Sequence, residues 1–287
     1  MTGGLKKMGE TEKGYLVVAE DLSALGGLST TAAYPILAAQ DVPVALLPTG
    51  IMSTQSEGFG VPVKLATASW IAATLKHWQD QHVPLHGALL GYIDSEEVSK
   101  ILHAFLTKVP LKLVIIDPVL ADEGLFYPEL TANQVHRTIK LLRHADFSTP
   151  NVTEACFLTG ERYLEKPTVM QQKQLLQKIQ LLMKPTGRAV ITGIRTDDRI
   201  GCAWLENGEV KHFFLPQMKG HFYGSGDAFA AVLTGQLWNG ASLTQAVCTA
   251  TQVTYNALQQ VVHAKSPRQY GLKIAPLIRE LLTKKQK

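Results

Sequence analysis

The sequence predicts an α/β fold: a three-layer sandwich in which a mostly parallel sheet, with an antiparallel hairpin at one edge, is flanked by helices. Short apolar segments alternate with longer helix-like segments along most of the 287 residues, as they do in parallel α/β proteins. Segments such as KLVIID and GALLGY are almost continuously apolar, which is typical of strands buried on both faces. Asn207-Gly208, between two β-prone runs, predicts the hairpin.

The order of the elements follows from these patterns. Strands are expected at 15–19, 42–47, 85–90, 111–116 and 188–192. Helices are expected between them at 29–39, 66–79, 95–108, 132–144 and 169–183. After the hairpin, helices are expected to begin at 224–227, at Ser242 (ending near Gln259) and at Ile274.

Composition narrows the classes of protein that this chain can belong to. It is 46% hydrophobic and 18% charged, which is ordinary for a globular protein, and its net charge of +4 is too small to indicate nucleic-acid binding. We expect no membrane partner, because no run of ~18 apolar residues occurs. The polar, glycine-rich residues 1–14 are expected to be a flexible tail before a single domain at 15–287.

The three cysteines, Cys156, Cys202 and Cys248, are widely spaced and form no CxxC pair. This pattern predicts neither a disulfide framework nor a zinc site, and it favours a cytoplasmic location. His77, His82 and His86 cluster in the sequence, but they are interpreted as surface residues rather than as metal ligands.

Carboxylates follow the apolar run that ends at Ile116. Asp117 is the first polar residue after that run, and Asp122 and Glu123 come soon after it. Ligands of open parallel sheets bind beyond the carboxyl ends of the strands, and carboxylates there can hold a hydrated Mg²⁺. The alternative interpretation is that these residues only form turns.

A second polar segment, Thr149-Pro150-Asn151, turns the chain after a short expected strand. Asn151 or Thr153 can cap the helix that follows, and Glu154 falls in its first turn, where a negative charge is favourable. Thr192-Gly193 ends another expected strand and places a hydroxyl and a bare backbone at the same rim. Taken alone, the first segment is also compatible with an ordinary capped helix.

The segment YGSGDAFAAVLTG, at 223–235, carries the clearest chemistry. Gly224 and Gly226 can take positive φ and let a ligand approach the backbone, and the N–H groups at a helix start form an anion site. Asp227 would face the bound anion and could accept a proton from an attacking hydroxyl. The alternative is a plain glycine turn with a capping aspartate.

Three motifs, DPVLADEG, TPNVTEA and YGSGDAFAAVLTG, occur in the order found in the ribokinase superfamily, and they resemble most its pyridoxal kinase branch. The earlier segment EDLSALGGLSTTAAYPILAAQDVPVALLPTGIMSTQSEGFG resembles the N-terminal half of bacterial pyridoxal kinases. The resemblance spans about residues 16–240 and implies a ribokinase-like fold. It also implies ATP-dependent phosphorylation of the 5′-hydroxymethyl group of vitamin B6 vitamers, which are small-molecule substrates.

The resemblance also assigns roles. Asp227 would be the general base, and the backbone of Gly224, Ser225 and Gly226 would be the anion hole. Mg²⁺ would be held through water by Asp117 and Glu154. ATP would be bound by Asp122, Tyr127, Thr149, Asn151, Glu154, Thr192 and Gly193. The vitamer would be bound by Asp21, Ser23, Thr49 and Ser53. A monovalent cation and a homodimer are further expectations by family analogy.

The chain departs from the family in the segments expected near the vitamer. Thr54-Gln55 stands where the substrate loop often has Asn-His, and Gly26-Gly27-Leu28 replaces a more polar Gly-Arg-Cys. Ser225 stands where the family usually has Thr, which leaves the backbone donors intact. We therefore expect turnover of pyridoxal to be selective, or weak relative to some other vitamer or pyrimidine, with the polar donors of the 54–55 loop setting the choice.

Three other functions are compatible with parts of the pattern. Kinases of hydroxymethylpyrimidine, a thiamine precursor, share most of these motifs but typically have Cys at the position of Asp227. Sugar kinases of the superfamily usually have a sheet-like lid, for which the sequence between Leu22 and Thr49 leaves little room. A non-catalytic binder of B6 vitamers is the third, and the presence of Asp227 and Glu154 argues against it.

Overall fold

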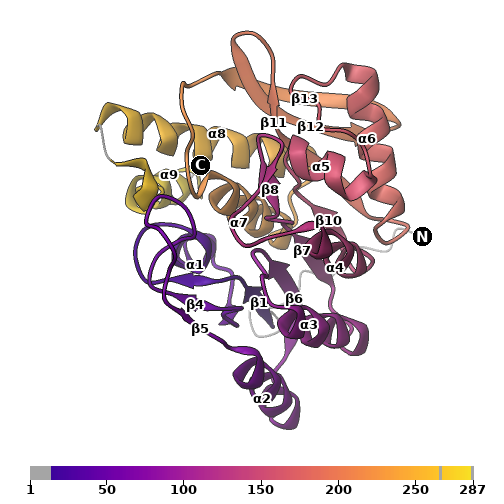
Figure 1. The fold of residues 1–287 in the computed structure, drawn as a ribbon, viewed down its shortest axis with the longest axis vertical. Helices are drawn as coiled ribbons and strands as arrows, with labels where there is room; N and C mark the ends of the chain where they lie inside the picture. Colours follow the sequence, from indigo (N-terminus) through magenta and orange to yellow (C-terminus); the bar gives the residue numbers. More distant parts are fainter. Residues whose placement is uncertain (1–13, 265–266, 286–287) are drawn as a thin grey trace, which may run out of the picture.

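The computed structural model describes residues 14–264 and 267–285, and all structural statements below concern them. Apart from Gly14, the expected N-terminal tail lies outside the described residues. The described chain forms an eight-stranded sheet between two layers of helices, so the predicted α/β sandwich is confirmed (Figure 1). Within the described ranges, no helix is both long and apolar enough to cross a membrane.

The large sheet has the strand order β13-β12-β11-β10-β7-β6-β1-β3. Its parallel part consists of β1 (Tyr15–Ala19), β3 (Val44–Leu46), β6 (Leu85–Leu90), β7 (Leu113–Ile116), β10 (Phe147–Ser148) and β11 (Arg188–Arg195). Its antiparallel edge consists of β12 (Arg199–Glu206) and β13 (Glu209–Pro216). Asn207 and Gly208, both with positive φ, join these two strands, so the hairpin prediction is confirmed.

Helices cover both faces of the sheet. One layer contains α2 (Ala68–Asp80), α3 (Glu96–Lys108), α4 (Ala132–Leu142), α5 (Val152–Thr159) and α6 (Val169–Leu181). The other contains α1 (Ser29–Ala38), α7 (Ser225–Trp238), α8 (Leu243–His263) and α9 (Ile274–Lys285). Successive residues of the central strands alternate between the layers: Val17 packs in the first, and Leu16 and Val18 in the second.

The observed strand limits differ from the predicted ones where backbone chemistry interrupts the pattern. β3 begins after Pro43, which has no N–H to contribute to a strand ladder. β11 continues beyond the predicted end at Thr192 to Arg195, past an irregularity in its pairing with β12 between Ile191 and Ile194.

Two small sheets were not predicted. One contains β2 (Leu22–Ser23), β4 (Ile51–Met52) and β5 (Lys64–Leu65), and the other is the pair β8 (Ala121–Asp122) and β9 (Leu125–Phe126). Each of these strands has two residues, which is too short to show any periodicity in sequence. Both sheets lie beside the ends of the parallel strands, where they help to wall the cavity described below.

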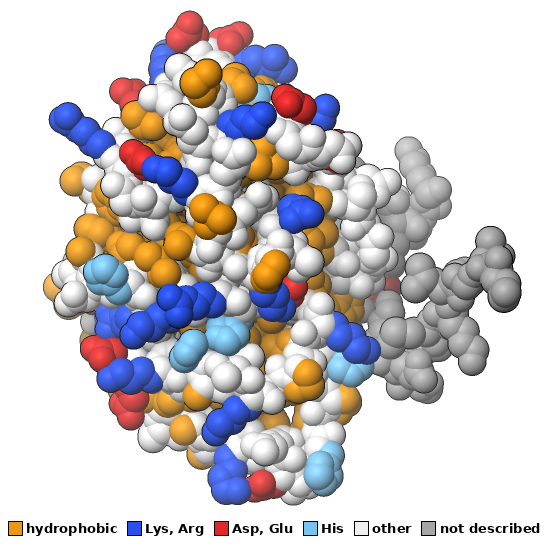
Figure 2. Space-filling model, turned by 90° about the vertical axis from the view of Figure 1, so that its right-hand side faces the viewer, with side chains coloured by type: hydrophobic (Ala, Val, Ile, Leu, Met, Phe, Trp, Pro, Cys, Tyr) orange, Lys and Arg blue, Asp and Glu red, His pale blue; other side chains and the backbone are white. Residues whose placement is uncertain are grey.

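On the face of the molecule that lies to the right in Figure 1, basic and acidic side chains are interspersed with hydrophobic ones (Figure 2).

The three cysteines are free thiols, and Cys156 and Cys202 are buried.

Replacing Leu90 should test how far the structure depends on the centre of the sheet. Leu90 is fully buried and Leu181 is 84% exposed, so the same substitution can be compared at both sites. We expect Leu90→Ala to lower the free energy of unfolding by about 2–5 kcal/mol, because it leaves a cavity, and Leu181→Ala to change it by less than about 0.5 kcal/mol. Urea unfolding followed by circular dichroism measures both, and equal losses would contradict the described packing.

Candidate active site

A cavity of about 600 Å³ opens where the parallel strands end and α7 begins. Its walls come from segments far apart in the chain, including the ends of β1, β7 and β10 and the first turns of α5 and α7. This is the edge of the sheet at which open α/β folds bind ligands. The residues that line it include Asp21, Asp117, Asp122, Tyr127, Thr149, Asn151, Glu154, Thr192, Gly193, Gly224, Ser225, Gly226 and Asp227.

The first turn of α7 presents its backbone to the cavity. Gly224, the N-cap residue, has φ 77°, and a Cβ there would lie 2.8 Å from the carbonyl oxygen of Gly27. Only a glycine fits this turn without strain. Gly226 does not have the positive φ that the sequence suggested, because it lies inside the helix; it is exposed, and a Cβ there would contact only Asp117, at 3.7 Å. The N-cap residue makes no side-chain cap, so the positive end of α7 is open to an anion.

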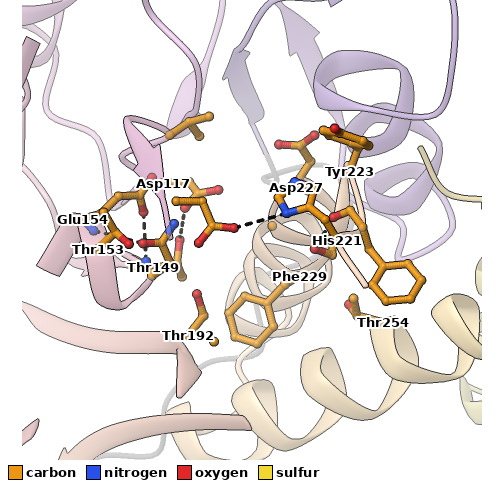
Figure 3. A pocket seen from close by; sticks show the side chains of 18 of the residues that line it. Asp117, Thr149, Thr153, Glu154, Thr192, His221, Tyr223, Asp227, Phe229 and Thr254 are labelled. Atoms are coloured by element: carbon orange, nitrogen blue, oxygen red, sulfur yellow. Dashed lines mark hydrogen bonds and ion pairs between the residues drawn. The ribbon is translucent and has the colours of Figure 1, made fainter. Parts of the chain in front are cut away.

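Asp227 joins the starts of two helices. Its Oδ2 accepts a hydrogen bond of 2.6 Å from the backbone N–H of Ser29, the first residue of α1. Burial raises the pKa of Asp227, and the Ser29 N–H partly opposes that rise. In Figure 3, Asp227 lies on the side of the cavity that α7 forms, and Asp117 and Glu154 lie across from it. A carboxylate held in this way can accept a proton next to an anion bound at the helix.

Asp117 and Glu154 are held by different partners. Asp117 accepts a hydrogen bond of 2.9 Å from the Thr149 hydroxyl, which joins the ends of β7 and β10. Its pKa is raised well above the usual range by burial, then by the charges of Glu154 and Asp227. Glu154 accepts backbone hydrogen bonds from Leu120 at 2.8 Å and from Asn151 at 2.9 Å. Burial nevertheless raises its pKa to about 7.

The helix that carries Glu154 starts in the way that its sequence predicts. Asn151 is the N-cap of α5: its Oδ1 accepts from the Glu154 N–H at 2.9 Å, while the Glu154 side chain accepts from the Asn151 N–H. Asn151 is therefore the capping residue, and Thr153 instead accepts a hydrogen bond from the Gly124 N–H at 3.0 Å. This box fixes the carboxylate at the end of the sheet.

Sequence reasoning missed one acidic residue at this edge, Glu20. It is 2% exposed, and its Oε2 has no hydrogen-bond partner within the described chain. Burial raises its pKa well above the usual range, and the charges of Asp227, Asp21 and Asp117 raise it further. Its neighbour Asp21 has a pKa raised to about 6, mainly by burial. The available signal for Glu20 was its position in the sequence, directly after the apolar run of β1 and before Asp21.

Three of the four residues expected to bind the vitamer stand behind or outside the cavity lining. Asp21 lines the cavity. Ser23 is fully buried and donates to Asp21 at 3.1 Å, and the Thr49 hydroxyl donates to the carbonyl of Tyr92 at 2.7 Å. Ser53 is exposed, and its hydroxyl oxygen accepts from the Val63 N–H at 2.9 Å.

The polar groups of the 54–55 loop are engaged within the protein. The Thr54 hydroxyl donates to the carbonyl of Gln55 at 3.0 Å, and the Gln55 amide donates to the carbonyl of Gln269 at 2.6 Å. These contacts occupy the Thr54 hydroxyl donor and the Gln55 amide donor, and the expectation that this loop sets substrate choice stays a prediction. Gln55 still borders the cavity.

The cavity also has an apolar end that sequence reasoning did not identify. Cys202 from β12, Phe229 from α7 and Leu258 from α8 line it, together with Thr254. The Thr254 hydroxyl is buried and has no hydrogen-bond partner in the residues described. These residues are far apart in the sequence, and the packing of α8 against both α7 and β12 brings them together.

Comparison with known proteins shows the family to which this chain belongs. A family model described as phosphomethylpyrimidine kinase matches residues 40–270. The crystal structure of pyridoxal kinase from Lactobacillus plantarum has a TM-score of 0.90 and 33% sequence identity, and the match covers 95% of this chain and 98% of that one.

Two curated relatives are similar in sequence. The pyridoxine/pyridoxal/pyridoxamine kinase of Bordetella avium is 27% identical over 251 residues, 81% of this chain and 80% of that protein. The hydroxymethylpyrimidine/phosphomethylpyrimidine kinase of Haemophilus influenzae is 29% identical over 168 residues, 56% of this chain and 60% of that protein, which is less than two thirds of its length. The resemblance to pyridoxal kinases that the motifs predicted is confirmed.

The cost of burying Glu20 can be measured. Because folding raises its pKa, the folded state holds the proton more tightly, and stability is lost as pH rises above the ordinary pKa of about 4.5. Glu20→Gln removes the charge and keeps the shape. We expect it to raise the free energy of unfolding at pH 8 by about 1.4 kcal/mol for each unit of pKa shift, and to change it little at pH 4.

Denaturant unfolding of both proteins across this pH range measures the difference. Lys76→Gln, at an exposed i,i+4 pair with Asp80, is the control and should show no such trend. A Glu20→Gln variant that is less stable than the native protein at pH 8 would refute the proposed repulsion.

Proposed function

The chain belongs to the phosphomethylpyrimidine kinase family, and we propose that it transfers the terminal phosphoryl group of ATP to the 5′-hydroxymethyl group of pyridoxal, pyridoxine or pyridoxamine. That it is a kinase of the pyridoxal and hydroxymethylpyrimidine type follows from the family and from the similarity to pyridoxal kinase over nearly the whole chain. One observation carries the finer proposal. Asp227, a half-buried carboxylate with a raised pKa, stands beside an open helix N-terminus inside a large cavity.

The chain's own residues would perform the transfer as follows. The N–H groups from Gly224 to Asp227 would bind the oxygens of the transferring phosphoryl group, because they carry the positive end of α7 and need no rearrangement. Asp227 would accept the proton of the 5′-hydroxyl as that oxygen attacks phosphorus. The bond from phosphorus to the bridging oxygen of ATP breaks, and ADP leaves with that electron pair.

The carboxylates across the cavity suit a divalent cation. Asp117 and Glu154 both border the cavity, and burial, followed by repulsion from the charge of Glu154, raises the pKa of Asp117 well above its usual range. A bound Mg²⁺ would relieve that repulsion, and oxygen ligands are the ones it prefers. These two side chains would hold it through water, and it would neutralise phosphate charge.

The apolar end of the cavity offers a place for the nucleotide base. Phe229 and Leu258 supply apolar surface, and the unpartnered hydroxyl of Thr254 supplies one polar group. Tyr127, Asn151 and Thr192 also line the cavity and would border the triphosphate. On this proposal Asp21, at the opposite side, binds the acceptor, with Ser23 and Thr49 holding the wall behind it.

Phosphorylation of hydroxymethylpyrimidine is the second candidate. The similarity to the Haemophilus influenzae hydroxymethylpyrimidine kinase and the description of the family model favour it. The similarity to pyridoxal kinase structure, at higher identity and over nearly the whole chain, favours the B6 vitamers. The test is ADP release from Mg·ATP in the presence of pyridoxal, pyridoxine, pyridoxamine or hydroxymethylpyrimidine. We expect the highest kcat/KM with a B6 vitamer; a higher value with the pyrimidine would favour the second candidate, and binding without turnover would favour a non-catalytic binder.

Asp227→Asn should separate catalysis from binding. The amide keeps the shape of the side chain but cannot accept the hydroxyl proton at neutral pH. We expect kcat on the best substrate to fall by about 10²–10⁴-fold, while the affinities for Mg·ATP and acceptor change little. Steady-state kinetics and calorimetric titration measure the two effects, and near-normal kcat would exclude Asp227 as the base.

Gly226→Val should fail in a different way. The fold has room for a Cβ at this position, because it meets only the Asp117 carboxylate at ordinary contact distance. The side chain would cover the N–H groups that we expect to contact phosphate, so nucleotide affinity should fall by at least about tenfold, as one lost charge-assisted hydrogen bond requires. Calorimetric titration with a non-hydrolysable ATP analogue measures this, and unchanged affinity would place the phosphates elsewhere.

A further inference from the structure

A short segment near the end of the chain lies against three of the loops around the cavity. Residues 268–272, here called the C-terminal strap, begin with the 3₁₀ turn Arg268–Tyr270 and end two residues before α9. No residue of the strap borders the cavity or carries a motif. Its contacts, however, fall on the loop before α7 and on the two loops at the acceptor side.

Arg268 holds the loop that leads into the first turn of α7. Its Nη2 donates to the carbonyl of Lys219 at 3.1 Å, and its Nη1 donates to the carbonyl of His221 at 3.4 Å. The guanidinium also lies 4.3 Å from the centre of the Phe222 ring. A guanidinium suits this task, because its planar fork can reach two carbonyls while it stacks on an aromatic face.

The same loop is shaped around the guanidinium. Gly220, between the two accepting carbonyls, has φ 106°, and a Cβ there would lie 1.5 Å from Nη1 of Arg268. Any other residue would displace either the loop or the arginine. The loop residues from Gly220 to Tyr223 all border the cavity, and the next residue is Gly224, at the start of α7.

The rest of the strap contacts the acceptor side. Gly27 donates to the carbonyl of Tyr270 at 2.9 Å and accepts from Leu272 at 3.2 Å, and these bonds form a parallel bridge. The carbonyl of Gln269 accepts the Gln55 amide, and the Tyr270 ring packs edge-on against Phe59, with 5.2 Å between the ring centres. One segment therefore fixes both the loop before α7 and the loops beside Asp21.

We propose that Arg268 is a positioning residue that holds the 219–223 loop, and through it the anion-binding turn at Gly224, in the geometry needed for phosphoryl transfer. It acts through backbone carbonyls and an aromatic ring rather than by touching the reactants. The consequence for catalysis rests on the proposed function. Displacement of a reacting group by about 1 Å can cost about 100-fold in rate, so loss of the Arg268 contacts with this loop should lower kcat.

The test compares Arg268→Ala and Arg268→Lys with a matched control, Arg199→Ala. Arg199 also donates to a backbone carbonyl, that of Phe214 at 3.3 Å, and lies 5.8 Å from the Phe214 ring centre, but it does not border the cavity. We expect Arg268→Ala to lower kcat by about 10–100-fold with a much smaller change in the KM of the acceptor. Arg268→Lys should be intermediate, and Arg199→Ala should behave as the native protein.

Two readouts separate positioning from a general loss of structure. Millimolar guanidinium added to Arg268→Ala should restore kcat several-fold, because it can occupy the vacated site between the carbonyls, and it should not affect the control. Hydrogen exchange should accelerate in residues 219–224 of Arg268→Ala and stay unchanged in β1, β6 and β7. If Arg268→Ala does not fold, Arg268→Lys carries the same comparison.

Native kcat and unchanged exchange in the Arg268 variants would overturn the proposal, as would equal losses in the Arg199 control. Exchange does not depend on turnover. If the native protein phosphorylates none of the tested acceptors, but hydrogen exchange in residues 219–224 is still faster in Arg268→Ala, the proposed function is wrong and the positioning role of Arg268 is supported. If the native protein is active but exchange in residues 219–224 is unchanged in Arg268→Ala, the positioning role is wrong and the proposed function is supported.

Discussion

The arrangement of this site depends on one constraint: several buried carboxyl groups lie close to the N-terminus of α7. Glu20, Asp21, Asp117 and Asp227 each have a pKa raised by burial, and in all but Asp227 by the charge of a neighbouring carboxylate as well. Such a group of buried acids is unfavourable unless positive charge offsets it. The first turn of α7 and the backbone N–H of Ser29 supply part of that compensation. On the proposed function, a bound cation would supply more.

Packing of the helices on the sheet fixes the N-terminus of α7 relative to these carboxyl groups. The central strands alternate their side chains between two cores, so both helix layers are anchored to the same sheet. Residues Ala228 to Gly235 of α7 are all buried, which fixes the helix along its length rather than along one face. The N-terminus of α7 therefore cannot move away from the carboxylates without breaking apolar packing. The loop before it is free of such packing and is instead held from outside by Arg268.

Sequence reasoning found the parts of the molecule whose signal is local. The long strands and helices have strong periodicity or continuous apolar runs, and the α5 capping box and the Asn207-Gly208 turn have fixed chemistry at fixed spacing. The carboxylates that follow strand ends were found for the same reason. Glu20 also follows a strand end, but that position alone shows neither that its side chain is buried nor that one of its oxygens has no hydrogen-bond partner. The apolar end of the cavity and the contacts of Arg268 were missed because they join residues that only the tertiary fold brings together.

The most direct test of the account is a crystal structure with a non-hydrolysable ATP analogue, Mg²⁺ and pyridoxal bound together. We predict that oxygens of the terminal phosphate accept hydrogen bonds from the N–H groups of Gly224 to Asp227. We also predict that the 5′-hydroxyl lies within hydrogen-bonding distance of Asp227, in line with the terminal phosphorus. A terminal phosphate bound away from the start of α7, or a hydroxyl out of reach of Asp227 with both ligands in place, would contradict it.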